Sequence, residues 1–254
     1  MGNHFIELNE WSENKVALVI HSGSRHLGKQ IAEYYQNRAY DELMEKWHEQ
    51  QQEIERLKKE GREEELAALK ESSPKEPVPK DLAYLEGDSF REYLHDMKIA
   101  QYFALVNRKA MVQTIAEHMG WKVVDRFTTI HNYIDMEHML LRKGAISAQK
   151  DERVIIPMNI RNGSIIAIGK GNPDWNYSAP HGAGRLMSRK QAKKKLSMKE
   201  FKKEMKGIWT TSVVPGTLDE SPMAYKPMEE IIAQIKDTVT IERVIKPLYN
   251  FKAT

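Results

Sequence analysis

The chain has 254 residues, of which 41% are hydrophobic and 30% charged, and its formal net charge is +3. This composition is typical of a globular protein with a sizeable core. The absence of cysteine excludes disulfides and thiolate metal ligands within the chain. Because a chain without cysteine fits a reducing compartment, we expect a cytoplasmic location. No apolar run approaches the ~18 residues of a membrane span. The N-terminal segment also lacks a basic region followed by an apolar one, so we expect neither a membrane partner nor a secretory signal.

The first part of the chain predicts a strand followed by long helices. Val16, Leu18 and Ile20 alternate, which indicates a short buried strand, and helical spacing begins at Leu27 after a Gly–Ser turn. The charged run over residues 40–71 is a strong helix former. Its thin apolar stripe consists of Leu43, Trp47, Ile54 and Leu57.

A proline-rich loop separates this run from a second long helix. Pro74, Pro77 and Pro79 break helical structure, and the apolar spacing over residues 89–119 predicts an amphipathic helix that stops at Gly120. We therefore expect a protruding helical hairpin, inserted at about residues 40–80.

The second half of the chain mixes strands with short helices. Residues 153–169 predict a β-hairpin that turns at Asn162–Gly163, residues 228–235 a helix, and residues 244–253 a final strand. Strands and helices do not alternate regularly, so we expect an α+β fold with mixed sheets and flanking helices, in one domain over residues 1–254.

A basic run lies between Arg185 and Lys206, where ten residues are Lys or Arg and two are Glu. Such a local excess of positive charge indicates a polyanionic partner. A solvated lysine-rich helix would explain the same run without any partner.

The stretch SAPHGAGRLMSR contains the most suggestive histidine. His181 lies between a proline and two glycines, Gly182 and Gly184, and is followed by Arg185 and Arg189. Glycine lets the backbone approach a ligand closely, and arginine is well shaped to bind phosphate. The pattern favours a phosphate site, although a glycine turn beside a packed imidazole would look the same.

Three further histidines stand in settings that suit a metal ligand. His4 lies in GNHFIE, His21 at the end of the first predicted strand, and His131 beside Asn132. A neutral imidazole at a strand end can present a ligand to a cleft. Each alone is more commonly a structural histidine, but together they predict three ligands and, in His181, a separate nucleophile.

Five motifs in order, GNHFIE, HSGSRHLG, HNYID, GKGNPDWNYSAPHGAGRLMSR and YNFKA, resemble the RtcB family of RNA-splicing ligases. The segment DMKIAQYFALVNR is similar to the central helix of that family. The resemblance runs from residue 3 to residue 252.

The resemblance implies a GTP- and Mn²⁺-dependent ligase acting in tRNA splicing or RNA repair. Such an enzyme joins an RNA 3′-phosphate or 2′,3′-cyclic phosphate to a 5′-hydroxyl. The resemblance implies that His181 attacks the α-phosphorus of GTP and becomes linked to GMP, which is nucleophilic catalysis. His4, His21 and His131 would be ligands of Mn²⁺, with two ions in the complete site.

The resemblance also implies binding residues for nucleotide and RNA. Glu7 would accept hydrogen bonds from guanine, which favours GTP over ATP, and Tyr225 would lie near the base. The nucleotide-binding set is Asn3, His4, Phe5, Ile6, Glu7, His131, Asn132, Pro157, Ser164, His181, Gly182, Ala183, Gly184, Tyr225 and Lys252. The RNA-binding set is Arg25, Arg185 and Arg189.

The chain departs from the family pattern at two places. The upstream motif that supplies an aspartate and a metal-bridging cysteine is absent, so we expect these residues to be the C-terminal part of such a ligase. The nucleotide loop reads PMNIRNGS, in which Pro157 and Ser164 keep their places but Met158, Asn159 and Ile160 do not match. Activity then needs the missing half, which a separate N-terminal fragment would supply. The alternatives are a nucleotide- or RNA-binding remnant, a split-ligase subunit that is inactive alone, and a generic metal-dependent hydrolase.

Overall fold

The computed structural model describes residues 4–74 and 76–252 and divides the chain into two compact units. The first unit comprises residues 1–23 and 107–254, and the second comprises residues 24–106. The mixture of helices and separate sheets confirms the predicted α+β class. Among the described residues, no helix has the length and apolarity needed to cross a bilayer.

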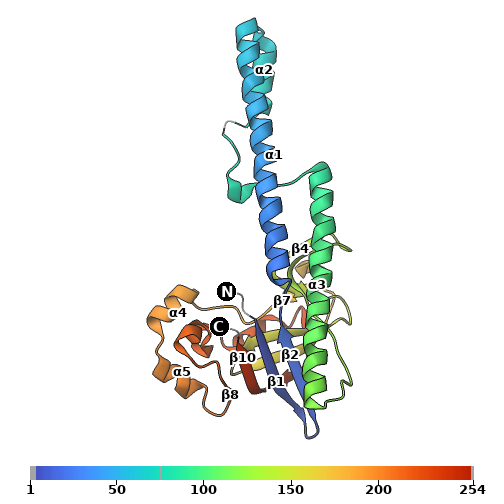
Figure 1. Cartoon of the computed structure of the whole chain (residues 1–254), viewed down its shortest axis with the longest axis vertical. Coiled ribbons are helices and arrows are strands. Elements are labelled where there is room, and N and C mark those ends of the chain that lie inside the picture. Colours follow the sequence, from blue (N-terminus) through green and yellow to red (C-terminus); the bar gives the residue numbers. More distant parts are fainter. Residues whose placement is uncertain (1–3, 75, 253–254) are drawn as a thin grey trace. The chain divides into compact units, whose positions relative to one another are not determined.

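Sheet A of the first unit pairs a strand near the start of the chain with a strand near its end. Its strands, which Figure 1 labels, have the order β2–β1–β10–β8. Phe5 lies opposite Lys252 on one side and opposite His21 on the other. The strands are β1 (Phe5–Ser12), β2 (Lys15–His21), β8 (Trp209–Thr210) and β10 (Pro247–Lys252). The strand predicted around Val16 and the final strand are therefore confirmed, and they belong to one sheet.

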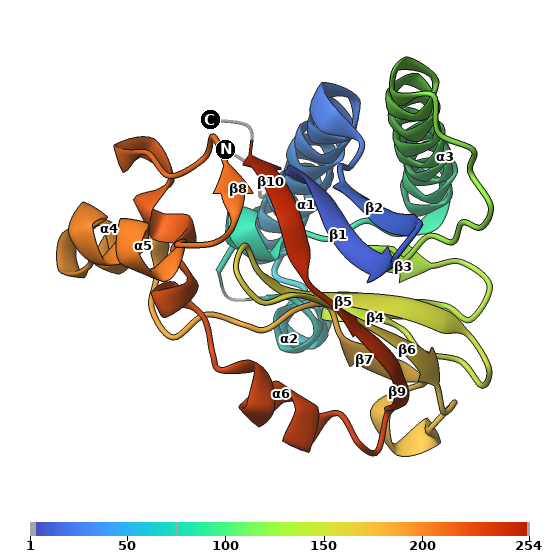
Figure 2. The ribbon, with the colours of Figure 1, turned by 90° about the horizontal axis from the view of Figure 1, so that it is seen from below.

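Two three-stranded sheets complete the first unit. Sheet B has the order β3–β4–β7 and sheet C the order β5–β6–β9. Their strands are β3 (His131–Asp135), β4 (Leu140–Ser147), β5 (Arg153–Asn159), β6 (Gly163–Gly169), β7 (Ser178–Pro180) and β9 (Val239–Ile245). Figure 2 shows β9 running directly into β10, so one stretch of chain serves both sheet C and sheet A.

The predicted hairpin over residues 153–169 is confirmed as β5 and β6. Its turn needs glycine, because Gly163 has φ +75° and an added Cβ would lie 2.0 Å from the carbonyl oxygen of Ile245. Alternate residues of β5 are buried, whereas nearly all of β6 is buried. The strand β6 is therefore the centre of sheet C and is covered on both faces.

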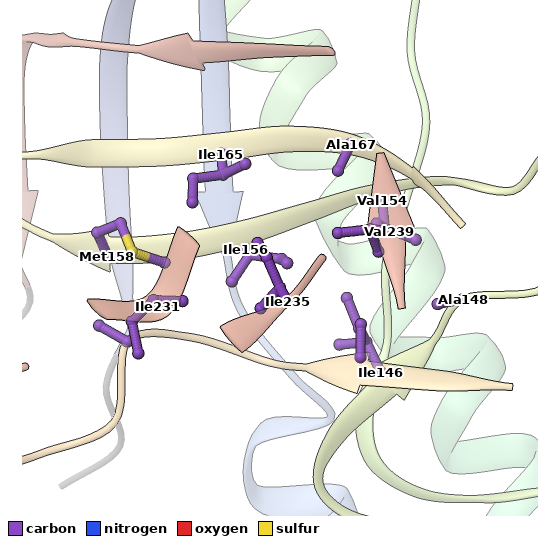
Figure 3. Close-up of a cluster of buried hydrophobic side chains, with 12 residues drawn as sticks. Ile146, Ala148, Val154, Ile156, Met158, Ile165, Ala167, Ile231, Ile235 and Val239 are labelled. Carbon is purple, nitrogen blue, oxygen red and sulfur yellow. The ribbon is translucent and has the colours of Figure 1, made fainter. Parts of the chain in front are cut away.

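The main core packs sheet C against a short helix. Ile156 and Met158 of β5 point toward Ile231 and Ile235 of the segment that contains α6 (Met228–Gln234) (Figure 3). Full burial of such side chains stabilises the fold by about 1.5–3 kcal/mol each. This core holds β5, on which part of the predicted nucleotide site lies.

The basic run forms two short helices rather than one solvated helix. They are α4 (Arg189–Lys195) and α5 (Met198–Glu204), and each begins at a serine cap, Ser188 or Ser197. Phe201 is fully buried in a second core cluster with Ile160, Met205 and Leu218. The lysines are thus carried on a packed scaffold. Short 3₁₀ turns flank these helices: η2 (Pro173–Trp175), η3 (Pro215–Glu220) and η4 (Pro222–Ala224).

The second unit contains the residues of the predicted helical hairpin. Its elements are α1 (Arg25–Glu60), α2 (Glu63–Ser72), η1 (Lys80–Leu82) and the start of α3 (Gly87–Met119), which continues into the first unit. The predicted helical run over residues 40–71 is broken at Gly61, whose φ of +69° ends α1. The Tyr35 hydroxyl donates to Asp96 at 2.9 Å, which ties α1 to α3 within this unit.

Candidate active site

Three histidines from three strands meet in the first unit. His21 ends β2, His131 begins β3, and His181 follows β7 directly. The Nε2 atoms of His21 and His131 lie 3.0 Å apart, and the rings of His131 and His181 are stacked at 4.8 Å between centroids. The ring of His4, just before β1, is 6.2 Å from that of His21. The structure therefore brings the four predicted histidines into one cluster.

Burial keeps two of these imidazoles neutral. Burial and, to a smaller extent, the charge of nearby His131 lower the pKa of His21 to about 4. Burial and then His181 also lower the pKa of His131. The neutral ring is the form that binds a metal ion.

The donor set fits part of a metal site. Two neutral nitrogens 3.0 Å apart can occupy neighbouring positions around one ion that is bound at about 2.1 Å. The Nδ1 atoms of His21 and His131 are buried without a hydrogen-bond partner. Within residues 4–74 and 76–252, however, no three His, Cys, Asp or Glu side chains are arranged to hold an ion.

Two aspartates that could have supplied an anionic ligand are engaged elsewhere. Asp135, at the far end of β3 from His131, pairs with Arg142 at 2.5 Å and with His138 at 3.0 Å. Asp125 pairs with Arg153 at 2.6 Å. Their partners explain why neither carboxylate contributes to the histidine cluster.

Glu7 is a buried carboxylate with one unused acceptor. It lies opposite Asn250 in sheet A, and the Asn250 amide donates to its Oε2 at 2.7 Å. Its Oε1 is buried and has no hydrogen-bond partner in the structure. Burial raises the pKa of Glu7 to about 7, against the lowering effect of Asn250. An unpaired buried acceptor suits a ligand that donates N–H groups.

Lys252 and Tyr225 converge on Glu220. Lys252 is buried and forms an ion pair with Glu220, and the Tyr225 hydroxyl donates to the same Glu220 oxygen at 2.6 Å. Burial alone would raise the pKa of Glu220, but the charge of Lys252 and its hydrogen bond lower it to about 2. Burial also lowers the pKa of Lys252, which the charge of Glu220 opposes. The predicted base-binding residues thus share a charged network.

Two of the three arginines predicted to bind RNA, Arg185 and Arg189, are part of the same network. Arg185 donates to the Tyr225 hydroxyl at 3.2 Å and to the Asp219 carbonyl at 2.6 Å. Arg189 donates to the Asp219 carboxylate at 2.6 Å and pairs with Glu220. Their internal partners give both side chains a structural role in the site. Arg25 begins α1 in the second unit.

Backbone contacts place the loop that carries His181 against β5. The Ala183 amide donates to the Pro157 carbonyl at 3.2 Å, and an added Cβ on Gly182 would lie 3.1 Å from that oxygen. Gly184 has φ +71°. Ser164, opposite Pro157, is fully buried. The structure therefore groups these predicted residues, and close approach explains the glycine at position 182.

The first strand and the turn after His131 account for the remaining predicted residues. Phe5 is buried and its ring meets His21 edge-on at 5.2 Å, whereas the neighbouring Ile6 lies on the opposite face of β1. Asn132 has φ +54°, and its side chain accepts from the Gly144 amide at 2.6 Å, which fixes the start of β3. Asn3 lies outside the described residues.

Sequence reasoning missed two sets of supporting residues. Asp219 and Glu220, the acidic partners of the arginines, are buried, and only their adjacency in TLDESP hinted at a role. Arg108 donates to the Ser22 carbonyl at 3.0 Å, and Asn107 donates to the Ser22 hydroxyl at 3.2 Å. These contacts hold the turn after His21. The NR pair in the central-helix motif was the available signal.

Comparison with known proteins identifies the family. The family described as "tRNA-splicing ligase RtcB" matches residues 1–253. The RNA-splicing ligase RtcB of Escherichia coli (strain K12) is 31% identical over 259 residues, covering 94% of this chain and 57% of the relative. The tRNA-splicing ligase RtcB of Aeropyrum pernix is 28% identical over 300 residues, covering 96% of this chain and 56% of the relative.

The chain therefore spans little more than half the length of these curated relatives. The family match, by contrast, extends over nearly all of its own residues. On this basis the chain belongs to the RtcB family.

Proposed function

We propose that this chain is the nucleotide-binding part of a GTP-dependent RNA ligase that joins a 3′-phosphate or 2′,3′-cyclic phosphate to a 5′-hydroxyl. The observation that carries the proposal is the convergence of His21, His131 and His181 from three separate strands. Membership of the RtcB family, whose relatives are named RNA- or tRNA-splicing ligases, supports the reaction class.

In the proposed reaction His181 is the nucleophile. A ring nitrogen attacks the α-phosphorus of GTP, a P–N bond forms, and pyrophosphate leaves. The RNA 3′-phosphate then takes the GMP, and the 5′-hydroxyl displaces it as the new phosphodiester forms. Stacking on His131 fixes the plane of the His181 ring, and the loop at Gly182 lets the backbone come close to the phosphates.

Mn²⁺ would be held by His21 and His131, with His4 beside them, and would polarise phosphoryl oxygens when bound. Neutral nitrogens alone leave the charge of a divalent ion uncompensated, so a complete two-ion site needs anionic ligands from another segment. The same consideration supports the reading that the chain is a split-ligase subunit or a binding remnant when it stands alone.

Guanine recognition is assigned to Glu7, Lys252 and Tyr225. The free Oε1 of Glu7 can accept from guanine N1–H or its amino group, a pattern that adenine cannot offer. RNA would be bound by the lysines of α4 and α5, since Arg185 and Arg189 already contact Asp219. Phosphate contacts of this kind position RNA without reading its sequence.

Labelling with α-³²P-GTP and Mn²⁺ tests the proposal. The labelled product should be acid-labile and alkali-stable, as a P–N bond is, and His181→Ala should abolish it. His118→Ala is the matched control, because His118 is an exposed histidine of α3 whose ring bonds to the Thr114 carbonyl. The assay is run with the chain alone and with the remaining part of the E. coli relative. Label that survives in His181→Ala would refute the assignment.

A further inference from the structure

Sheet A is unusual in that its buried face is polar. Glu7 and Asn9 of β1 and Asn250 of β10 are each at most 2% exposed, and Lys252 is also buried. Side chains alternate along a strand, so the residues between them point to the other side of the sheet. The residues on that opposite side determine what kind of layer can cover the sheet.

The opposite face of sheet A is apolar. Residues paired across strands share a face, and here Ile6 pairs with both Phe251 and Ile20. Leu8 pairs with Tyr249 and Leu18, and Tyr249 pairs with Trp209. We define the apolar face as Ile6, Leu8, Val16, Leu18, Ile20, Trp209, Tyr249 and Phe251.

Much of the apolar face is open to solvent. Trp209 is 81% exposed, Phe251 42% and Tyr249 37%. Sheets normally bury their apolar face against another layer, and a contiguous exposed apolar patch of this kind marks an interaction site. All four strands of sheet A contribute residues to it.

The composition of the face favours a polypeptide partner over RNA. Glu10, opposite Val16, is charged, and Lys15, opposite Ser12 beyond a register shift, lies at the edge of the paired positions. A surface that binds RNA needs positive charge for the phosphates as well as aromatic rings. Aliphatic and aromatic side chains without lysine or arginine resemble half of a domain core.

The comparisons indicate a candidate for that polypeptide. More than two fifths of the E. coli relative lies outside the match, and the A. pernix relative likewise extends beyond it. The relatives therefore contain a substantial segment of the family's fold that the matched residues do not include. We propose that the apolar face of sheet A is the docking surface for that remaining segment of the RtcB fold. This inference rests on family membership and not on the proposed ligase activity.

Hydroxyl-radical footprinting tests the proposal without any activity readout. The probe is the part of E. coli RtcB outside the match, fused to the 254-residue chain in the order that this relative has, with the unfused chain as baseline. Fusion keeps the local concentration high, so that weak docking across species is still detected. We expect oxidation of Trp209, Tyr249 and Phe251 to fall by about fivefold or more, as for side chains at the centre of an interface.

Two exposed residues away from sheet A serve as internal controls. Trp175 is 56% exposed and Leu141 is 76% exposed, and their oxidation should stay unchanged in the fusion. With the segment supplied as a separate chain by co-expression, Trp209→Ser/Tyr249→Ser/Phe251→Ser should reduce co-purification by about tenfold. The matched variant Leu141→Ser/Trp175→Ser/Tyr177→Ser should leave it within about twofold.

Three results would overturn the proposal. Equal oxidation of Trp209 in the fused and unfused chains would show that the segment docks elsewhere. Protection of the unfused chain that grows with its concentration, together with a doubled mass, would show a second copy on the face. Protection by single-stranded RNA alone would show a nucleic-acid surface. Loss of GTP labelling with protection retained would refute the proposed function and leave the docking surface standing.

Discussion

Replacing Glu7 by Gln is expected to stabilise the protein and weaken GTP binding at the same time. Burial raises the pKa of Glu7 from its usual 4.5 to about 7. One pKa unit corresponds to about 1.4 kcal/mol, so ionised Glu7 lowers the free energy of unfolding by about 3 kcal/mol. Glutamine carries no charge, and its Oε1 can accept the same hydrogen bond from Asn250.

The sign of the pH dependence follows from the raised pKa. The folded protein holds the Glu7 proton more tightly than the unfolded chain does. The stability that this proton provides is therefore complete below pH 4.5, the unfolded value, and is lost as the pH rises through about 7. The free energy of unfolding of Glu7→Gln should accordingly exceed that of the wild type by about 3 kcal/mol near pH 8 and equal it at acidic pH.

GTP binding should show the opposite trend. If guanine donates to the ionised carboxylate, the competent fraction is about one tenth near pH 6 and about nine tenths near pH 8. Apparent affinity should then rise about ninefold over that interval, and Glu7→Gln should bind more weakly without this dependence.

Urea unfolding and titration calorimetry with GTP at both pH values measure the two effects. Glu10→Gln is the matched control, because Glu10 lies on the same strand and is exposed. If the free energy of unfolding depends on pH equally in the wild type and in Glu7→Gln, the cost assigned to burying ionised Glu7 is refuted. An unaltered pH profile of GTP affinity in Glu7→Gln would refute its role in guanine recognition.

Three other features of the site lead to expected outcomes. Lys252→Met should destabilise the protein by about 3 kcal/mol in urea unfolding, because it leaves Glu220 buried without its main partner. Lys226→Met, which removes only an exposed ion pair with Glu230, should cost less than about 1 kcal/mol. Equal losses in the two variants would contradict this. Four lysine-to-glutamine changes in α4 and α5 should reduce the salt slope of RNA affinity by about 3, whereas an unchanged slope would favour a merely solvated surface. The four are Lys190, Lys194, Lys199 and Lys203. In equilibrium dialysis the isolated chain should bind fewer than two Mn²⁺, since neutral histidines do not offset the charge of two ions; two tightly bound ions would contradict this.

Local patterns in the sequence predicted elements but not how they assemble. Alternation at Val16, Leu18 and Ile20 indicated β2, and Asn162–Gly163 indicated the hairpin. The break at Gly61 was hidden, because helix formers surround it and a single glycine is tolerated in many helices. The pairing of β1 with β10 joins opposite ends of the chain and leaves no local signal.

The candidate site shows the same limit. His21 and His131 are 110 positions apart, so no spacing rule could place their Nε2 atoms 3.0 Å from each other, and only the order of motifs suggested it. The role of Arg189 depended on a partner, the Asp219 carboxylate, that is distant in sequence. Guanidinium groups bind phosphates and carboxylates with the same geometry, so residue type alone did not distinguish RNA binding from an internal contact.

The two faces of sheet A connect the site with the docking surface. Glu7 and Lys252 are held buried on one side of β1 and β10, at a cost in desolvation. Leu8 and Phe251 on the other side stabilise the same strands only when they are covered, by about 25 cal/mol for each Å² removed from water. A polypeptide that binds the apolar face therefore stabilises the conformation that holds Glu7 and Lys252 in place. Linkage between two sites on one folded state is reciprocal. GTP bound on the polar face would therefore strengthen the binding of that polypeptide in turn.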